Sequence, residues 1–267
     1  MKMVEKGRGV DNGVLGFLPQ GASVVSLQNQ KGGAAMQSGD MDGDGYCEIA
    51  VAYKLDGEIR VMVLKKYANG WHRAAQVKEE GYNINFIGLR DMTGDGRAEL
   101  LVGWQEGAIW SRLYIYTLEG DSLHKIVDGI PYSMLEVMDT WENNHITDRS
   151  RIALWLHDTG EAYRVDILYW NGFELVSDKK AYPYYFPKVV AYYKEKVKEM
   201  PDAAFYWYYL ADAQVKAGMA EEALVSIEKG LRLNADYPSK DEFMKLKEMA
   251  EKMLMPREIM LYPASIN

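Results

Sequence analysis

Two stretches decide how this chain folds and what it binds: DMDGDGYCE (residues 40–48) and DMTGDGRAE (residues 91–99). In both, oxygen-bearing side chains stand at positions 1, 3, 5 and 9, and a glycine stands at position 6. Alternate residues of a tight turn direct their oxygens inward, and the glycine permits the bend. This pattern suits a hard cation that takes about six to eight oxygen ligands. We therefore predict two calcium sites.

Both predicted sites take their oxygen ligands from the same positions of the motif. The first takes oxygens from the side chains of Asp40, Asp42, Asp44 and Glu48 and from the backbone carbonyl of Tyr46; the second takes them from Asp91, Thr93, Asp95 and Glu99 and from the carbonyl of Arg97. Because the first has four carboxylates and the second three, we expect the first to bind calcium more tightly. The alternative is that these Asp-Gly turns are solvated hairpins without an ion.

The residues after each motif exclude an EF-hand. An EF-hand needs a glutamate at position 12 and a helix after it, but position 12 is Val51 in one copy and Val102 in the other. The continuations EIAVAY (48–53) and ELLVGW (99–104) are short apolar runs that predict buried strands. Each ion would therefore clamp a turn between two strands.

A repeat of about 50 residues surrounds the motifs. Asp40 and Asp91 stand 51 residues apart, and hairpin turns at 69–70, 119–120 and 171–172 follow at intervals of 50 and 52 residues. The pattern predicts about three units of four antiparallel strands, with a period typical of β-propellers. A further strand at 22–27 could pair with the other end of the array and close the ring.

The third unit departs from the motif. Its strand RIALWL (151–156) aligns with 99–104 and puts Arg151 in the place of Glu99, and the segment 139–150 has no glycine. A guanidinium would repel a cation, so we expect this unit to have lost its ion, although Asp139 and Asp148 leave binding there open as an alternative.

The acidic loop followed by an apolar strand, at this period, resembles the FG-GAP and VCBS repeats of integrin-type β-propellers. The resemblance covers residues 17–180, although the FG-GAP dipeptides themselves are absent and the units are fewer than the family usually has. It implies a propeller-like fold in which calcium is structural and the domain recognises a partner instead of catalysing a reaction. The predicted domain boundaries are 14–182 for this part and 183–256 for a helical part.

The C-terminal part resembles a tetratricopeptide repeat. The small and large residues expected of that repeat are Trp207, Leu210, Ala211, Gly218, Ala223 and Ile227. Gly230 replaces the usual alanine. We predict four helices that start near residues 187, 202, 220 and 239. Because so short a solenoid cannot bury its apolar faces alone, it should pack on the β part. The aromatic residues at 182–193 and 205–209 would form that contact or, alternatively, a groove for a peptide or glycan.

Composition excludes several classes of protein. The net charge of −8 and the lack of a basic stripe argue against a nucleic-acid partner. No apolar run is long enough to span a membrane, and the N-terminus does not look like a signal peptide. The chain would be extracytoplasmic or at a bacterial cell envelope if a leader had been removed, and cytoplasmic otherwise.

The chain has no recognisable catalytic motif. The four histidines lack zinc spacing, and the Asp-Thr-Gly at 158–160 occurs once, whereas aspartic proteases need two such carboxylates. The sequence thus predicts a non-enzymatic calcium-binding recognition or scaffold protein that binds a protein, peptide or glycan, without catalytic residues or an organic cofactor. The alternative is a hydrolase that acts on polysaccharide or peptide in an interdomain cleft.

Overall fold

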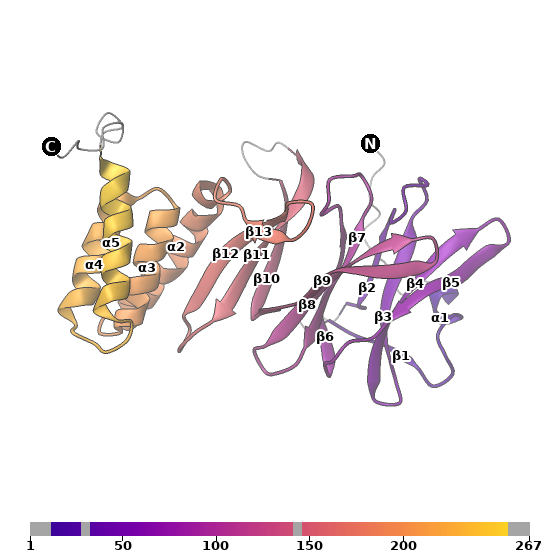
Figure 1. Cartoon of the computed structure of the whole chain (residues 1–267). Coiled ribbons are helices and arrows are strands. Elements are labelled where there is room, and N and C mark those ends of the chain that lie inside the picture. The colour runs from indigo at the N-terminus through magenta and orange to yellow at the C-terminus, as the bar shows by residue number, and fades with distance from the viewer. Residues whose placement is uncertain (1–11, 28–32, 141–145, 256–267) are drawn as a thin grey trace. The chain divides into compact units, whose positions relative to one another are not determined.

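The computed structural model describes residues 12–27, 33–140 and 146–255 (Figure 1). Three antiparallel sheets are followed by a group of helices, which confirms the predicted α+β class with the strands first. A short helix, α1 (Asn12–Leu15), precedes the strands.

The sheets follow one another along the chain. The first holds β1 (Ser23–Val24), β2 (Met36–Gly39), β3 (Glu48–Leu55), β4 (Glu58–Tyr67) and β5 (Gly70–Val77). The second holds β6 (Asn83–Arg90), β7 (Glu99–Gln105), β8 (Ser111–Glu119) and β9 (Ser122–Tyr132). The third holds β10 (Met134–Thr140), β11 (Ile146–His157), β12 (Tyr163–Trp170) and β13 (Leu175–Ser177). The second and third sheets are built in sequence order, so their neighbouring strands need only short connections.

Among the described residues, the strand predicted at 22–27 pairs within the first sheet. Its regular part, β1, pairs antiparallel with β3, and Ser23 lies opposite Lys54. β2 pairs with the other half of β3, from Met36 opposite Val51 to Gly39 opposite Glu48. Closure of a ring through this strand is not shown among the described residues. β1 and β2 are better described as two segments along one edge of the first sheet.

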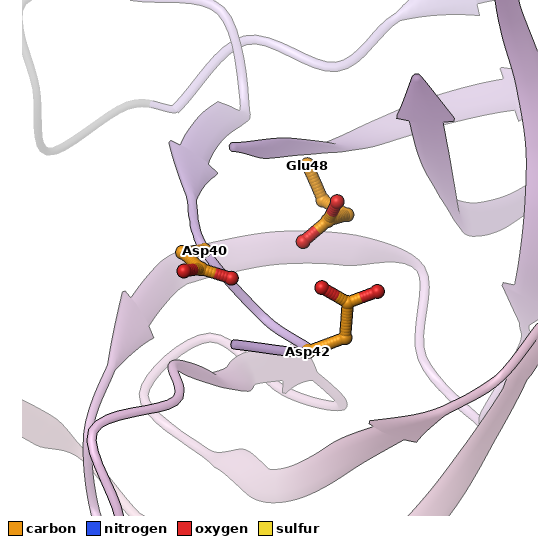
Figure 2. Close-up of side chains that lie close together, drawn as sticks. All are labelled: Asp40, Asp42 and Glu48. Atoms are coloured by element: carbon orange, nitrogen blue, oxygen red, sulfur yellow. The ribbon is translucent and has the colours of Figure 1, made fainter. Parts of the chain in front are cut away.

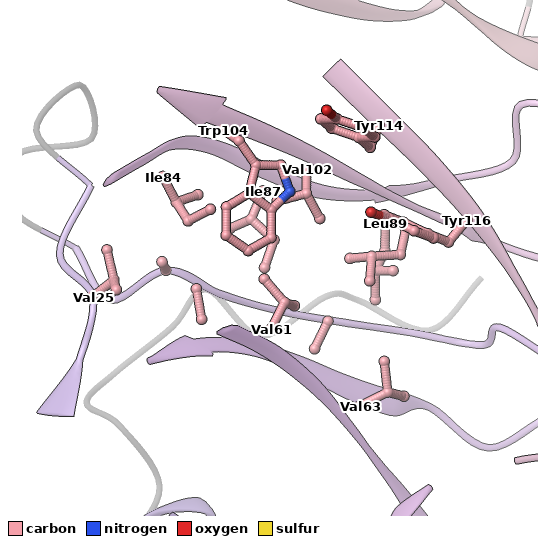
Figure 3. Packing of buried hydrophobic residues seen from close by; sticks show 14 of the residues in the cluster. Val25, Val61, Val63, Ile84, Ile87, Leu89, Val102, Trp104, Tyr114 and Tyr116 are labelled. Atoms are coloured by element: carbon pink, nitrogen blue, oxygen red, sulfur yellow. The ribbon is translucent and has the colours of Figure 1, made fainter. Parts of the chain in front are cut away.

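Successive sheets pack face to face through apolar side chains. Trp104, Val102 and Leu100 on one face of β7 lie in one core with residues of the first sheet such as Val61 and Val63 (Figure 3). Leu101, on the other face of β7, lies in a second core with Ile152 and Leu154 of β11. Because β7 is covered on both faces, its sequence is a continuous apolar run instead of an alternating one.

The C-terminal helices are α2 (Tyr182–Glu199), α3 (Ala204–Lys216), α4 (Ala220–Arg232) and α5 (Lys240–Leu254). The starts predicted near 202, 220 and 239 lie close to those of α3, α4 and α5, but α2 begins five residues before the predicted 187. Pro187 lies inside α2, where it removes one backbone donor, and Pro183 occupies the first turn, which tolerates proline. The burial of Tyr185 and Phe186 explains why the helix continues through Pro187.

The chain forms two compact units. Of the described residues, 12–27, 33–140, 146–154 and 168–176 belong to one unit, and 155–167 and 177–255 belong to the other. This division runs through β11 and β12, whereas the boundary predicted at 182 and 183 follows the change from strands to helices.

Aromatic side chains join the helices of the second unit to the ends of β11 and β12 that belong to the same unit. The Tyr193 hydroxyl donates to the carbonyl of Tyr163 at 2.6 Å and accepts from its N–H at 2.8 Å. Trp155 Nε1 donates to the Tyr185 hydroxyl at 2.8 Å. These aromatic residues of α2 therefore form an internal core, which favours the packing interpretation over an open groove at these positions.

Candidate metal centre

The first acidic loop connects β2 to β3 and is held by its own side chains. Both carboxylate oxygens of Asp40 accept backbone N–H groups, from Gly43 at 2.7 Å and from Gly45 at 3.0 Å. Asp44 accepts from the N–H of Tyr46 at 2.8 Å. Glu48 at the start of β3 accepts from the N–H of Met41 at 2.8 Å, which ties the two ends of the loop together.

The second loop connects β6 to β7 and repeats these four backbone hydrogen bonds. Asp91 accepts from the N–H groups of Gly94 at 2.6 Å and Gly96 at 2.8 Å, and Glu99 accepts from that of Met92 at 2.7 Å. The glycines at positions 4 and 6 have φ between 80° and 86° in both loops, a conformation that glycine adopts without strain. The two motifs therefore encode the same backbone shape.

The first loop brings three of its predicted side-chain ligands together. One carboxylate oxygen each of Asp40, Asp42 and Glu48 lies within 4.8 Å of the others, and Figure 2 shows the three carboxylates directed toward a common centre. Three carboxylates at this spacing are a suitable donor set for a hard divalent cation. Asp44 lies outside this group, although it belongs to the predicted set.

A lysine that the sequence did not predict reaches the first loop. The Lys65 ammonium group, on β4, donates to Asp42 and lies 3.9 Å from Asp44 Oδ2. The hydrogen bond to Asp42 raises the pKa of Lys65, although burial opposes the shift. Lys65 is 23 residues from Asp42 in the sequence, and the register of β3 with β4 brings it to the loop.

The second loop differs at Asp95. The Arg97 guanidinium binds Asp95 through Nη2 at 2.5 Å and through Nε at 2.8 Å. Burial acts to raise the pKa of Asp95, but these hydrogen bonds outweigh it and lower the pKa. Thr93 Oγ1 donates to Glu99 Oε1 at 3.3 Å. Within the described part of the chain, Asp91, Asp95 and Glu99 do not form a close group of three like that of the first loop.

The glutamates at position 9 are the buried charges of the two loops. Glu48 is 1% exposed and Glu99 is 2% exposed. Burial raises the pKa of both, that of Glu99 to about 7, although hydrogen bonds from backbone N–H groups oppose the shift. A bound divalent ion would compensate this buried charge, because opposite charge favours the ionised carboxylate.

The remaining predicted positions are accounted for as follows. The side chain of Tyr46 is 68% exposed, which leaves its backbone carbonyl as the predicted ligand at position 7. In the third unit, Arg151 is buried and donates to the carbonyl of Arg149 at 2.6 Å. The side chains of Asp139 and Asp148 lie outside the described residues. Asp158, in the single Asp-Thr-Gly, lies in the turn between β11 and β12 and accepts from the Tyr237 hydroxyl.

No protein-family model matches the chain, and no curated protein matches it either. Among the described residues, no helix is long and apolar enough to cross a membrane.

Proposed function

We propose that this chain is a non-enzymatic calcium-binding recognition or scaffold protein of the FG-GAP and VCBS repeat type, with a tetratricopeptide-like helical part. Calcium would bind at both acidic loops and stabilise the β repeats. The observation that carries the proposal is the convergence of Asp40, Asp42 and Glu48 on one centre, within a loop whose backbone pattern the second motif repeats.

Structural calcium fits the places that the loops occupy. Each loop joins two strands, so an ion would fix the connection without needing an open coordination position for a substrate. The faces of the sheets and helices would then serve a protein, peptide or glycan partner.

A hydrolase remains the alternative function. It would need two close carboxylates outside the loops, one of them with a raised pKa. Among the described carboxyl groups, those with a raised pKa are Glu48 and Glu99, which both lie in the loops.

Thermal unfolding with and without calcium tests the proposal. For dissociation constants on the order of 10⁻⁴ to 10⁻³ M, ~10 mM calcium should stabilise the fold by about 1.4 to 2.7 kcal/mol per site relative to a chelator. Magnesium at the same concentration is the control for ionic strength, and we expect a smaller shift because it demands a tighter octahedral shell. An equal unfolding temperature in calcium and in chelator would contradict the proposal.

A further inference from the structure

The second acidic loop touches the first through two consecutive residues. The N–H of Ala98, at position 8 of the second loop, donates to the carbonyl of Asp40 at 2.8 Å. The alkyl stem of Arg97, at position 7, covers Gly43, and its Cγ lies 3.2 Å from the point where a Cβ of Gly43 would stand. Asp40 is a predicted ligand of the first ion, and Gly43 donates to its carboxylate.

Corresponding contacts recur one unit further along the chain, although Arg149 meets the glycine through its guanidinium and Arg97 through its alkyl stem. The N–H of Ser150 donates to the carbonyl of Asp91 at 2.7 Å, and Arg149 Nε lies 3.1 Å from the corresponding Cβ point on Gly94. Ser150 and Arg149 align with Ala98 and Arg97 because Arg151 aligns with Glu99. The third unit therefore keeps the two contacts with the preceding loop but has an arginine at position 9.

From these contacts we propose that the two loops bind calcium cooperatively and that the third unit supports the second loop. This inference rests on the proposed function. An ion in the second loop would bind the backbone carbonyl of Arg97. It would thereby fix the position of the next backbone N–H, that of Ala98. The contacts that Ala98 and Arg97 already make with Asp40 and Gly43 would then be restrained before the first loop binds its ion. By linkage, an ion in the first loop must strengthen the second site by the same factor.

Calorimetric calcium titration of the wild type, Glu48→Gln and Glu99→Gln tests this coupling. Each glutamine keeps an oxygen that can accept the N–H of Met41 or Met92 but removes a ligand charge, so each variant reports the other site alone. The wild type gives an overall association constant for binding both ions, and each variant gives the constant of one site. We expect the overall constant to exceed the product of the two single-site constants by at least about fivefold. A product equal to the overall constant would overturn the inference while leaving calcium binding itself established. Absence of any uptake by the wild type would instead contradict the proposed function.

Two substitutions of Arg97 separate packing from charge. Arg97→Met and Arg97→Ala both remove the guanidinium, but only methionine keeps a side-chain stem over Gly43. We expect Arg97→Met to retain the coupling factor of the wild type and Arg97→Ala to reduce it at least about threefold, within the range of allosteric coupling. Arg73→Ala, at an exposed position of β5, is the control for the loss of a surface arginine and should leave the coupling unchanged. Equal coupling in the two Arg97 variants would contradict a role for this contact.

Discussion

Lys65 supplies the first loop with a positive charge from a neighbouring strand. Its ammonium group contacts Asp42 and lies 3.9 Å from Asp44 Oδ2, so a divalent ion that used both carboxylates would have to displace it. In the second loop, Arg97 plays a comparable part at Asp95. In each loop a cationic side chain therefore binds one of the carboxylates, and the first loop keeps the larger number of carboxylates. Its tighter calcium binding stays a prediction.

Replacing Lys65 with methionine should strengthen calcium binding at the first loop. Methionine preserves most of the stem and removes the competing charge, so we expect the affinity of that site to rise by about tenfold, or roughly 1.4 kcal/mol. Calorimetric titration measures the change. Lys66→Met removes a charge from an exposed position next along β4 and is the matched control. An unchanged affinity in Lys65→Met would show that the ammonium group does not compete with the ion.

Glu99 gives the calcium-free protein a defined pH dependence. Its pKa is raised from 4.5 to about 7. Between these two pH values, the carboxyl group is therefore protonated in the folded state and ionised in the unfolded state. This contribution to stability is complete below pH 4.5 and is lost as the pH rises through about 7. Relative to Glu99→Gln, we expect calcium-free wild type to lose about 2 kcal/mol between roughly pH 5 and pH 8 in urea unfolding. A constant difference between the two proteins over this range would contradict the assignment.

At the scale of elements, Gly230 shows how one position in α4 depends on a neighbouring helix. A Cβ on Gly230 would lie 2.4 Å from Phe243 Cζ on α5 and 3.2 Å from Trp207 Cβ on α3. The Phe243 ring fills the space that an alanine methyl group would need. The lack of a side chain at this position therefore has a steric cause, which the sequence alone did not indicate.

Gly230→Ala should destabilise the protein although alanine favours helices. Overpacking costs about 1 to 3 kcal/mol, and the gain in helix propensity returns about 1 kcal/mol, so we expect a net loss of up to about 2 kcal/mol in chemical denaturation. The control is Val225→Ala at an exposed position of α4, which should change stability by less than about 0.5 kcal/mol. A stabilised Gly230→Ala protein would mean that Phe243 moves aside freely.

At the scale of the whole molecule, calcium should act on one of the two compact units. Both loops belong to the unit that contains the first and second sheets, and α3, α4 and α5 belong to the other. In hydrogen exchange, we therefore expect added calcium to slow exchange at the amides of β2, β3, β6 and β7 and to leave those of α4 and α5 unchanged. Equal slowing in all of these elements would contradict a local effect of the ions.

Local patterns predicted much of the fold. The apolar runs after each loop became β3 and β7, and Asn171 with Gly172 located the turn after β12 although the third unit lacks the motif. Features that depend on residues far apart in the sequence were not predicted. The pairing of β1 with β3 and the approach of Lys65 to Asp42 depend on strand register. The extension of α2 through Pro187 depends on tertiary burial, which outweighs the local proline signal.

The number of calcium ions bound per chain tests the central claim most directly. Equilibrium dialysis of the metal-free protein against millimolar calcium should give two ions per wild-type chain, one for Glu48→Gln and one for Glu99→Gln. Binding of no calcium by the wild type, or an unchanged number in both variants, would contradict the assignment of the ions to these loops.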